Sequence, residues 1–329
     1  MAQVSSSVVA SLSIQIMWLA RLCPAPCNIP TSLKQRTALF ITASSSGSSG
    51  RRSFSTDEVS THGLSLGGMP LPLPCFHSTE WVKNQTFAAE DDPDRTQQPW
   101  EPPAFVRIDD PKKQHVKMKV EEICFQNTPV LHSSSSFARI VHGVLDADQC
   151  FELIQSVNNK GFTPALLNIG HGRQKVSPST RDGHRVIVDS PELTIWLLEA
   201  LRPHIPEVFR QAELVDLNER CRFLLYNPAQ KFVPHRDANY RRPQGQPNAG
   251  DRSQVTIQLY LNDLPEEAGG ATRFMGRKDS RTLPGPKCQP GAGSVLLFSQ
   301  DLYHEGSELI AGLKYTMRTE AMYRKQATQ

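Results

Sequence analysis

The first 56 residues contain no aspartate or glutamate, although an even spread of the chain's 33 acidic residues would place five or six there. The same stretch holds five basic residues and many serines, and it ends in Arg51-Arg52-Ser53-Phe54-Ser55-Thr56. Such an arginine-containing, acid-poor composition is typical of organelle transit peptides. Residues 1–56 are therefore predicted to be a targeting segment, with a mitochondrial destination as the first interpretation and a plastid as an alternative.

A long apolar run is missing from this segment as well. The run at 7–20 falls short of the roughly 20 residues that a membrane-spanning helix needs. No basic residue precedes it, which argues against a secretory signal peptide. A signal or short anchor for the secretory pathway is therefore the second interpretation, and a tail without targeting function is the third. No stable membrane insertion is expected.

Strong net charge is also absent. The chain of 329 residues carries +3, and beyond residue 56 it has 31 basic against 33 acidic residues. A near-neutral body has no electrostatic footprint for nucleic acid, so nucleic acid is not expected as a partner. The seven cysteines are odd in number and scattered, which argues against a disulfide framework and favours reduced thiols. Nothing in the composition bears on the oligomeric state.

Apolar periodicity is scarce from residue 57 to residue 115. Eight prolines fall between residues 61 and 113, together with an acidic patch at 90–94. This composition favours a Pro-rich linker or an extended arm wrapped on the rest of the protein. Residues 116–329 are then expected to form the folded domain, with helical support at 138–210 and a core at 221–325.

Two helices are signalled in the support region. Asp146 can cap a helix that Gly161 ends, because an aspartate accepts from free backbone N–H groups and glycine tolerates the helix exit. Ser190 followed by Pro191 is a typical helix start, and this second helix is expected to reach about Leu201.

Strand signals surround these helices. Strands are predicted at 116–130 and 138–144, and after residue 213 short alternating strands follow, separated by Gly, Pro and Asn. This pattern of short strands predicts a β-sandwich or barrel with helices packed on one side.

Two of these strands separate into a polar and an apolar face. In the strand predicted at 255–262, the apolar residues alternate with polar ones: Val255, Ile257, Leu259 and Leu261 with Thr256, Gln258, Tyr260 and Asn262. In the last strand, Lys314, Thr316 and Arg318 alternate with Tyr315 and Met317. Because side chains two apart share a face of a strand, the polar sets are expected to line a cavity; a solvated outer face is the alternative.

A candidate metal site begins with His235 and Asp237, which stand two residues apart and can reach one ion from a strand. With 10 histidines and 33 acidic residues, such a triplet occurs about once by chance, so alone it could equally be a surface pair. His304, just past the apolar strand at 293–298, supplies a third ligand. Lys314, ten residues later, can point a cation into the same cavity.

Six motifs follow one another between residues 226 and 324. They are Y-x5-F-x2-H-x-D at 226–237, L-Y-L-N at 259–262, G-G-x-T-x-F at 269–274, G-S-V-L-L-F at 293–298, H-E-G at 304–306 and G-x-K-Y-x2-R at 312–318. In this order they resemble the iron(II)- and 2-oxoglutarate-dependent dioxygenases, most closely the prolyl 4-hydroxylase-like branch. Ala229 departs from the pattern, since the family often has glycine after this tyrosine.

The resemblance implies a mostly β (α+β) fold, a double-stranded β-helix or jelly roll with supporting N-terminal helices. It implies that His235, Asp237 and His304 form the catalytic two-histidine, one-carboxylate triad that binds Fe(II). The residues implied for 2-oxoglutarate are Lys314 and Tyr260 on its distal carboxylate, Tyr226 beside it, and Arg318 on either cofactor or substrate.

The implied activity is hydroxylation of an unactivated C–H bond, with release of succinate and CO2 and with ascorbate as an accessory reductant. A peptidyl-proline in a protein or peptide partner is the first expectation for the substrate. A free amino acid or small metabolite is an alternative, and so is a non-catalytic jelly roll used for binding or sensing. Two polar segments, 168–185 as a lid and 240–252, are candidate borders of the substrate entrance, or else plain surface loops.

Overall fold

The computed structural model describes residues 65–66, 69–72, 74–76, 86–88, 100–106, 118–171, 173–278 and 281–325. The predicted targeting segment 1–56, with its apolar run, lies outside these residues, so its role stays a prediction. Among the helices that are described, none has the length and apolar character to cross a membrane.

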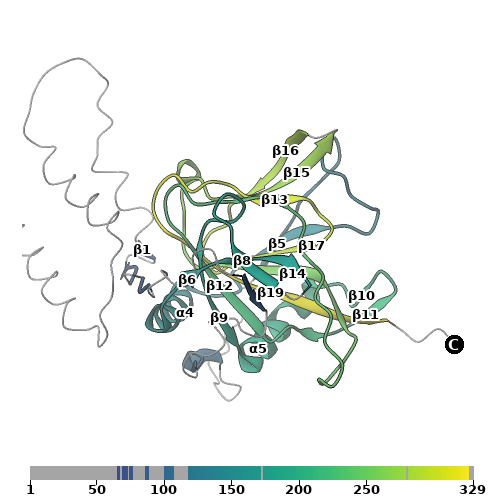
Figure 1. The fold of residues 1–329 in the computed structure, drawn as a ribbon, viewed down its shortest axis with the longest axis horizontal. Helices are drawn as coiled ribbons and strands as arrows, with labels where there is room; N and C mark the ends of the chain where they lie inside the picture. Colours follow the sequence, from purple (N-terminus) through teal and green to yellow (C-terminus); the bar gives the residue numbers. More distant parts are fainter. Residues whose placement is uncertain are drawn as a thin grey trace, which may run out of the picture.

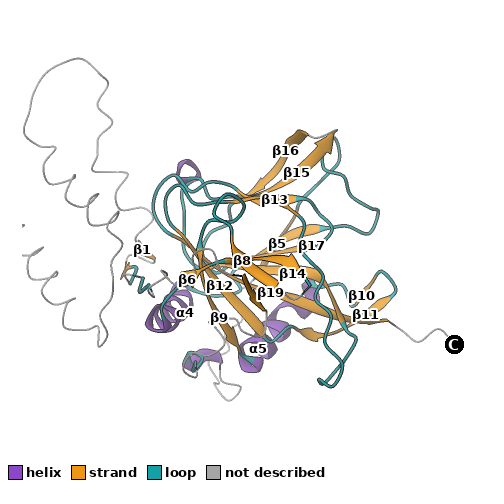
Figure 2. Cartoon of the chain, viewed as in Figure 1, coloured by secondary structure: helices purple, strands orange, loops and turns teal. Residues whose placement is uncertain are grey.

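Two antiparallel sheets form the body of the protein, a jelly roll in which the helices lie against the larger sheet (Figures 1 and 2). The larger, ten-stranded sheet runs in the order β4 (Lys119–Glu122), β5 (Ala138–His142), β17 (Val295–Ser299), β14 (Arg252–Tyr260), β19 (Lys314–Lys325), β12 (Arg220–Tyr226), β9 (His184–Asp189) and β6 (Thr163–Pro164), with β11 (Ala212–Leu217) on β19 and β10 (Val208–Phe209) on β11. The smaller sheet runs β13 (Phe232–His235), β18 (His304–Gly306), β15 (Thr272–Lys278) and β16 (Arg281–Cys288).

The remaining elements are short. A three-stranded sheet joins β3 (Thr86–Ala88), β8 (Arg173–Val176) and β7 (Leu166–Gly170), and a two-stranded one joins β1 (Ser65–Leu66) to β2 (Met69–Pro70). Single 3-10 turns are η3 (Ala104–Val106), η4 (Arg202–His204) and η5 (Glu266–Ala268).

The predicted helices are confirmed with their caps. In α4 (Ala147–Lys160) the Asp146 side chain accepts from the backbone N–H of Gln149, and Gly161 follows the helix with φ +82°. In α5 (Pro191–Leu201) the Ser190 hydroxyl accepts from the N–H of Leu193. Each cap satisfies a backbone group that the helix itself leaves free, a contribution of about 1 kcal/mol.

The two-faced pattern of β14 and β19 is also confirmed. Val255, Ile257 and Leu259 belong to the main hydrophobic core, which also contains the apolar faces of α4 and α5. Burying such a side chain contributes about 1.5–3 kcal/mol relative to leaving it exposed. The opposite face of β14, which carries Thr256 and Gln258, is therefore turned away from the helices and toward the smaller sheet.

Pieces of the predicted Pro-rich arm pack on this core. Leu66, Leu71 and Val106 are buried in it. The indole N–H of Trp100 donates to the hydroxyl of Ser156 on α4 at 3.2 Å. Of the two interpretations of the arm, these contacts favour a segment wrapped on the protein.

Three local predictions are wrong in extent. The first strand, predicted at 116–130, is only β4, and the strand predicted at 138–144 ends at 142, because Gly143 takes φ +74°. The predicted lid loop 168–185 is largely the hairpin β7–β8, and β8 pairs with β3, about 90 residues earlier in the chain. That pairing is between distant segments, so local sequence carries no sign of it. The support region at 138–210 accordingly contains strands as well as two helices.

The turn between β12 and β13 confirms that Ala229 occupies an unusual position. Its φ is +72°, in the left-handed region that favours glycine, and its N–H donates to the carbonyl oxygen of Leu309 at 2.7 Å. An alanine there carries backbone strain of about 1–2 kcal/mol, because its Cβ crowds the following carbonyl oxygen. An alanine therefore occupies a turn position that favours glycine.

Replacing Ala229 by glycine is expected to raise the free energy of unfolding by about 0.5–1 kcal/mol, since relief of strain exceeds the extra freedom of the unfolded chain. Urea denaturation followed by circular dichroism measures the change. Ala249→Gly is the matched control, because Ala249 is an exposed loop residue outside the left-handed region and should lose about 0.5 kcal/mol. Equal destabilisation by both substitutions would contradict the account.

Candidate metal centre and its cavity

The metal centre is set by the pairing of β13 with β18. In this antiparallel pair His235 lies directly opposite His304, and Asp237 follows two residues after His235. The Nε2 atom of His235 is 3.6 Å from Oδ1 of Asp237, and Nε2 of His304 is 4.0 Å from Oδ2. One ligand atom from each lies within 4.8 Å of the others, and no other such group of three occurs in the described part of the chain. The three predicted ligands are thus brought together.

Both imidazoles are oriented through their Nδ1 atoms. Nδ1 of His235 contacts the carbonyl oxygen of Val233 at 2.8 Å, and Nδ1 of His304 contacts that of Leu302 at 3.0 Å. A carbonyl oxygen only accepts, so each Nδ1 carries the hydrogen and each Nε2 keeps a free lone pair. The ring of Phe232 stacks on His235 with centroids 3.6 Å apart and holds its plane.

The protonation states also suit a cation. Burial lowers the pKa of His304 to about 4, so the ring is neutral at physiological pH. Burial would raise the pKa of Asp237, but Arg318 and the two histidines outweigh it and hold that pKa well below its usual range. A neutral His304 imidazole and the Asp237 carboxylate therefore face the same point, and a metal ion would displace no proton from either of them.

The Asp237 carboxylate is held from the larger sheet. The hydroxyl of Thr256 on β14 donates to Oδ2 at 2.6 Å, and the Arg318 guanidinium on β19 lies 3.1 Å from Oδ1. Arg318 is in turn 3.4 Å from Glu320, which is paired with Arg222 at 2.9 Å. The structure thus places Arg318 on the ligand carboxylate, a contact that the sequence did not anticipate.

A cavity adjoins these ligands and is lined by three of the four residues predicted for 2-oxoglutarate, Lys314, Tyr226 and Arg318, whereas Tyr260 is not among its lining residues. The Lys314 ammonium donates to the carbonyl oxygen of Gly270 at 2.6 Å and lies 5.5 Å from the ring centroids of Tyr226 and Tyr260. Burial lowers the pKa of Lys314 to about 8. The Tyr260 hydroxyl is 2.7 Å from the hydroxyl of Thr272, so its partner is a side chain of β15.

The polar atoms of this cavity fit an anionic, chelating cosubstrate. Three buried atoms that face it have no hydrogen-bond partner in the described structure: Oγ1 of Thr316, Nε of Arg318 and Nε of Arg181. The open space between the side chains is about 30 Å³, so a dicarboxylate enters only if side chains move. The Lys314 ammonium could exchange the Gly270 oxygen for a carboxylate.

Arg181 is the functional candidate that sequence reasoning missed. Its side chain is half-buried with a buried Nε atom, its guanidinium lies 4.9 Å from the ring centroid of Phe232, and burial lowers its pKa to about 10. It reaches the cavity because the turn after β8 pairs with β13, through a bridge between Arg181 and Phe232. Only this bridge between distant segments places Arg181 at the cavity, so no local sequence pattern could have identified it. Thr256 also supports the site, and it could have been identified from the sequence, because it belongs to the polar face of its strand.

Comparison with known proteins agrees with these observations. The family model described as the 2OG-Fe(II) oxygenase superfamily matches residues 221–319. This interval contains all three candidate metal ligands and Lys314. No curated protein matches the sequence.

Similar solved structures include a viral collagen prolyl hydroxylase from Paramecium Bursaria Chlorella virus-1, which is 18% identical, with 56% of this chain and 95% of that one covered and a TM-score of 0.39. A Pseudomonas putida prolyl-4-hydroxylase is 22% identical, with coverage of 50% and 77% and a TM-score of 0.34. A Trichoplax adhaerens prolyl hydroxylase in complex with a hypoxia inducible factor peptide is 16% identical, with coverage of 57% and 83% and a TM-score of 0.43. All three TM-scores are below 0.5, and all three sequences are less than 25% identical to this one.

The KM for 2-oxoglutarate is expected to be nearly flat below pH 7 and to rise about tenfold between pH 7 and pH 9. Only the ammonium form of Lys314 attracts a carboxylate, and with its pKa lowered to about 8 this form disappears over that interval. Succinate formation at several 2-oxoglutarate concentrations measures the KM at each pH.

Lys314→Arg is the matched control, because a guanidinium stays charged throughout the range and should remove the rise. A flat KM in the unaltered protein, or the same rise in the variant, would argue against Lys314 as the carboxylate anchor.

Proposed function

Since residues 221–319 belong to the 2OG-Fe(II) oxygenase superfamily, the chain is an iron(II)- and 2-oxoglutarate-dependent oxygenase, and we propose that it hydroxylates a proline in a peptide or protein. Succinate and CO2 are the proposed co-products, and ascorbate is the proposed accessory reductant. The order of the six sequence motifs between residues 226 and 324 supports the choice of proline.

The observation that carries the proposal is the one-sided arrangement of three ligands next to a cationic cavity. Nε2 of His235, Nε2 of His304 and a carboxylate oxygen of Asp237 would hold Fe(II). Three protein ligands leave coordination positions for a 2-oxo acid and dioxygen, the pattern of non-haem iron oxygenases. When bound, the iron supplies the activation of dioxygen that no side chain of the chain can provide.

Lys314 is proposed to bind the distal carboxylate of 2-oxoglutarate. Its ammonium lies at the inner end of the cavity between the Tyr226 and Tyr260 rings, where a carboxylate could replace the Gly270 oxygen as acceptor. Tyr260 and Thr272 offer hydroxyl groups to the same end. A charge-assisted contact in a buried site is stronger than in water, so a single lysine is an adequate anchor.

Charge in the cavity supports a dianion. Arg181, Lys314 and Arg318 line it, and of the three only Arg318 forms ion pairs within the described structure, with Asp237 at 3.1 Å and Glu320 at 3.4 Å. Burial raises the pKa of the Tyr226 phenol, which therefore stays protonated and can donate. The tyrosine ring packs against the turn at Gly183, where an added Cβ would come within 2.9 Å of it. This packing keeps bulk water away from the reacting centre.

Localisation is a separate proposal. The acid-free composition of residues 1–56 supports import into the mitochondrion, with cleavage near the arginines at 51 and 52.

The proposed activity is tested with the full chain, Fe(II), ascorbate, 2-oxoglutarate and a library of proline-containing peptides. Succinate is expected to form in step with a peptide mass gain of one oxygen. His235→Ala should lower turnover by at least about 100-fold, because a metal ligand is lost. His132→Ala, which removes an exposed histidine outside the site, is the control and should retain turnover.

Other outcomes assign the activity differently. Turnover of a free amino acid or metabolite, with none of any peptide, would replace the peptide substrate by a small molecule. If no succinate forms under any condition and His235→Ala leaves metal binding unchanged, the chain is a non-catalytic binding module.

A further inference from the structure

A second cavity, of about 620 Å³, adjoins the metal pocket and shares Asp237 with it. Its volume lies within the range of about 300–1,000 Å³ that ligand pockets have. The lining is strongly basic, and Asp237 and Asp301 are its only carboxylates. The basic residues that line it are Arg210, Arg236, Arg241, Arg252 and Lys325.

Two of these cations are already held by Asp301. Arg210 forms an ion pair with the Asp301 carboxylate at 2.7 Å, and Nε of Arg236 donates to the Asp301 carbonyl oxygen at 2.8 Å. Asp237 is paired with Arg318. Neither carboxylate is therefore left to neutralise the other three basic side chains.

Those three, Arg241, Arg252 and Lys325, are exposed. Within the described ranges, none of them forms an ion pair with an acidic residue. Three unneutralised cations therefore line one cavity beside the metal ligands.

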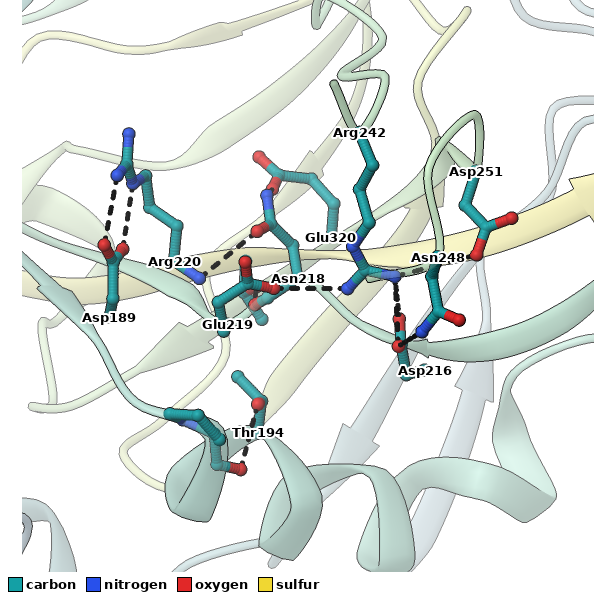
Figure 3. Close-up of polar contacts among 12 residues, drawn as sticks. Asp189, Thr194, Asp216, Asn218, Glu219, Arg220, Arg242, Asn248, Asp251 and Glu320 are labelled. Carbon is teal, nitrogen blue, oxygen red and sulfur yellow. Dashed lines mark hydrogen bonds and ion pairs between the residues drawn. The ribbon is translucent and has the colours of Figure 1, made fainter. Parts of the chain in front are cut away.

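Each of the three stands next to a residue of an ion network that faces the other way. The buried Arg242 contacts Asp216 at 2.9 Å and Glu219 at 3.1 Å (Figure 3). Asp251 is buried as well and lies 3.7 Å from Arg242 and 2.9 Å from Arg324. The two guanidinium groups of this network are matched by three carboxylates, and the network fixes the loop that follows Asp237.

Arg324 and Lys325 are successive residues of β19, and successive side chains on a strand point to opposite faces. Arg324 accordingly contacts the network while Lys325 lines the cavity. In the same way Arg242 and Asp251 lie in the network, and their neighbours Arg241 and Arg252 line the cavity.

The pairing of two arginines is unfavourable without an anion. Arg241 and Arg252 are direct antiparallel partners across an isolated bridge. Like charges directly opposite one another on paired strands destabilise the pairing. A carboxylate bound between them would remove this repulsion.

We propose that this cavity binds acidic side chains of the peptide substrate, so that the enzyme selects a residue flanked by aspartate or glutamate. This inference rests on the proposed peptide hydroxylase function. A cavity of this volume is about 10 Å across, which corresponds to about three residues of extended chain. The selected carboxylates therefore lie within a few residues of the hydroxylated one, since the cavity borders Asp237.

The cavity's size and surroundings favour an acidic peptide over a nucleic acid. Beyond residue 56 the chain as a whole is near neutral, with 31 basic and 33 acidic residues, whereas this cavity gathers five basic residues. A phosphate backbone is usually followed by a basic stripe or face.

The test uses the full chain under argon with Fe(II) and 2-oxoglutarate, and fluorescein-labelled nine-residue peptides with a central proline. The flanks are Asp and Glu, Ser and Gln, or Lys, and fluorescence anisotropy gives each Kd. The acidic peptide is expected to bind at least about tenfold more tightly than the neutral one, and its affinity should fall as salt is raised.

Arg241→Gln and Arg252→Gln are each expected to weaken the acidic peptide about fivefold, and the double variant about 20-fold, with the neutral peptide unchanged. Arg252→Lys keeps the charge and should stay within about twofold. Arg281→Gln, on β16, is the matched control: it replaces an exposed arginine outside both cavities and should bind like the unaltered protein.

Equal affinity for acidic, neutral and basic peptides would overturn the inference, as would variants that bind the acidic peptide normally. Tighter binding of a labelled single-stranded oligonucleotide than of the acidic peptide would also overturn it.

Succinate formation without peptide, which depends on the metal and Lys314 alone, separates this test from the proposed function. Hydroxylation of peptides regardless of flanking charge refutes the acidic selection and keeps the hydroxylase. Charge-dependent binding without any hydroxylation keeps the site and refutes the proline chemistry.

Discussion

The antiparallel pairing of β13 with β18 is the constraint on which the rest of the site depends. It places His235 directly across from His304, and each Nδ1 is tied to a backbone carbonyl two residues earlier. Because the side-chain period of a strand is two, a slip of one residue would turn one imidazole to the opposite face. The larger sheet completes the site, since Thr256 from β14 and Arg318 from β19 fix the Asp237 carboxylate.

Buried charge links this geometry to cosubstrate binding. Arg181, Lys314 and Arg318 lie where water is largely excluded, and burial lowers the pKa of both Arg181 and Lys314. A buried cation without a full set of partners is costly, and a bound dicarboxylate supplies those partners. Part of the binding free energy of the cosubstrate thus comes from removing the unfavourable free energy of the incompletely paired buried cations. The neighbouring basic cavity also holds cations without acidic partners. Its cations are exposed at the surface, and strand alternation, instead of deep burial, separates them from the carboxylates.

Sequence alone predicted the features that depend on neighbouring residues, namely helix caps and the two faces of a strand. The caps at Asp146 and Ser190 fixed two helices, and the two-residue alternation of β14 and β19 identified the polar face that lines the cavity. What escaped depends on contacts between distant segments. Arg181 reaches the cavity only through its bridge to Phe232, and Arg318 met Asp237 only when two strands paired. Local sequence patterns do not predict such pairings. The family motifs identify the metal ligands but not the residues that orient them.

The most direct test of the central claim is anomalous diffraction at the iron absorption edge, from crystals grown anaerobically with Fe(II) and 2-oxoglutarate. The account predicts one strong peak per chain, about 2.0–2.2 Å from Nε2 of His235, Nε2 of His304 and an Asp237 oxygen, with the distal carboxylate of 2-oxoglutarate on Lys314. A peak bound by other residues, or a cosubstrate bound with no iron between these three side chains, would contradict it.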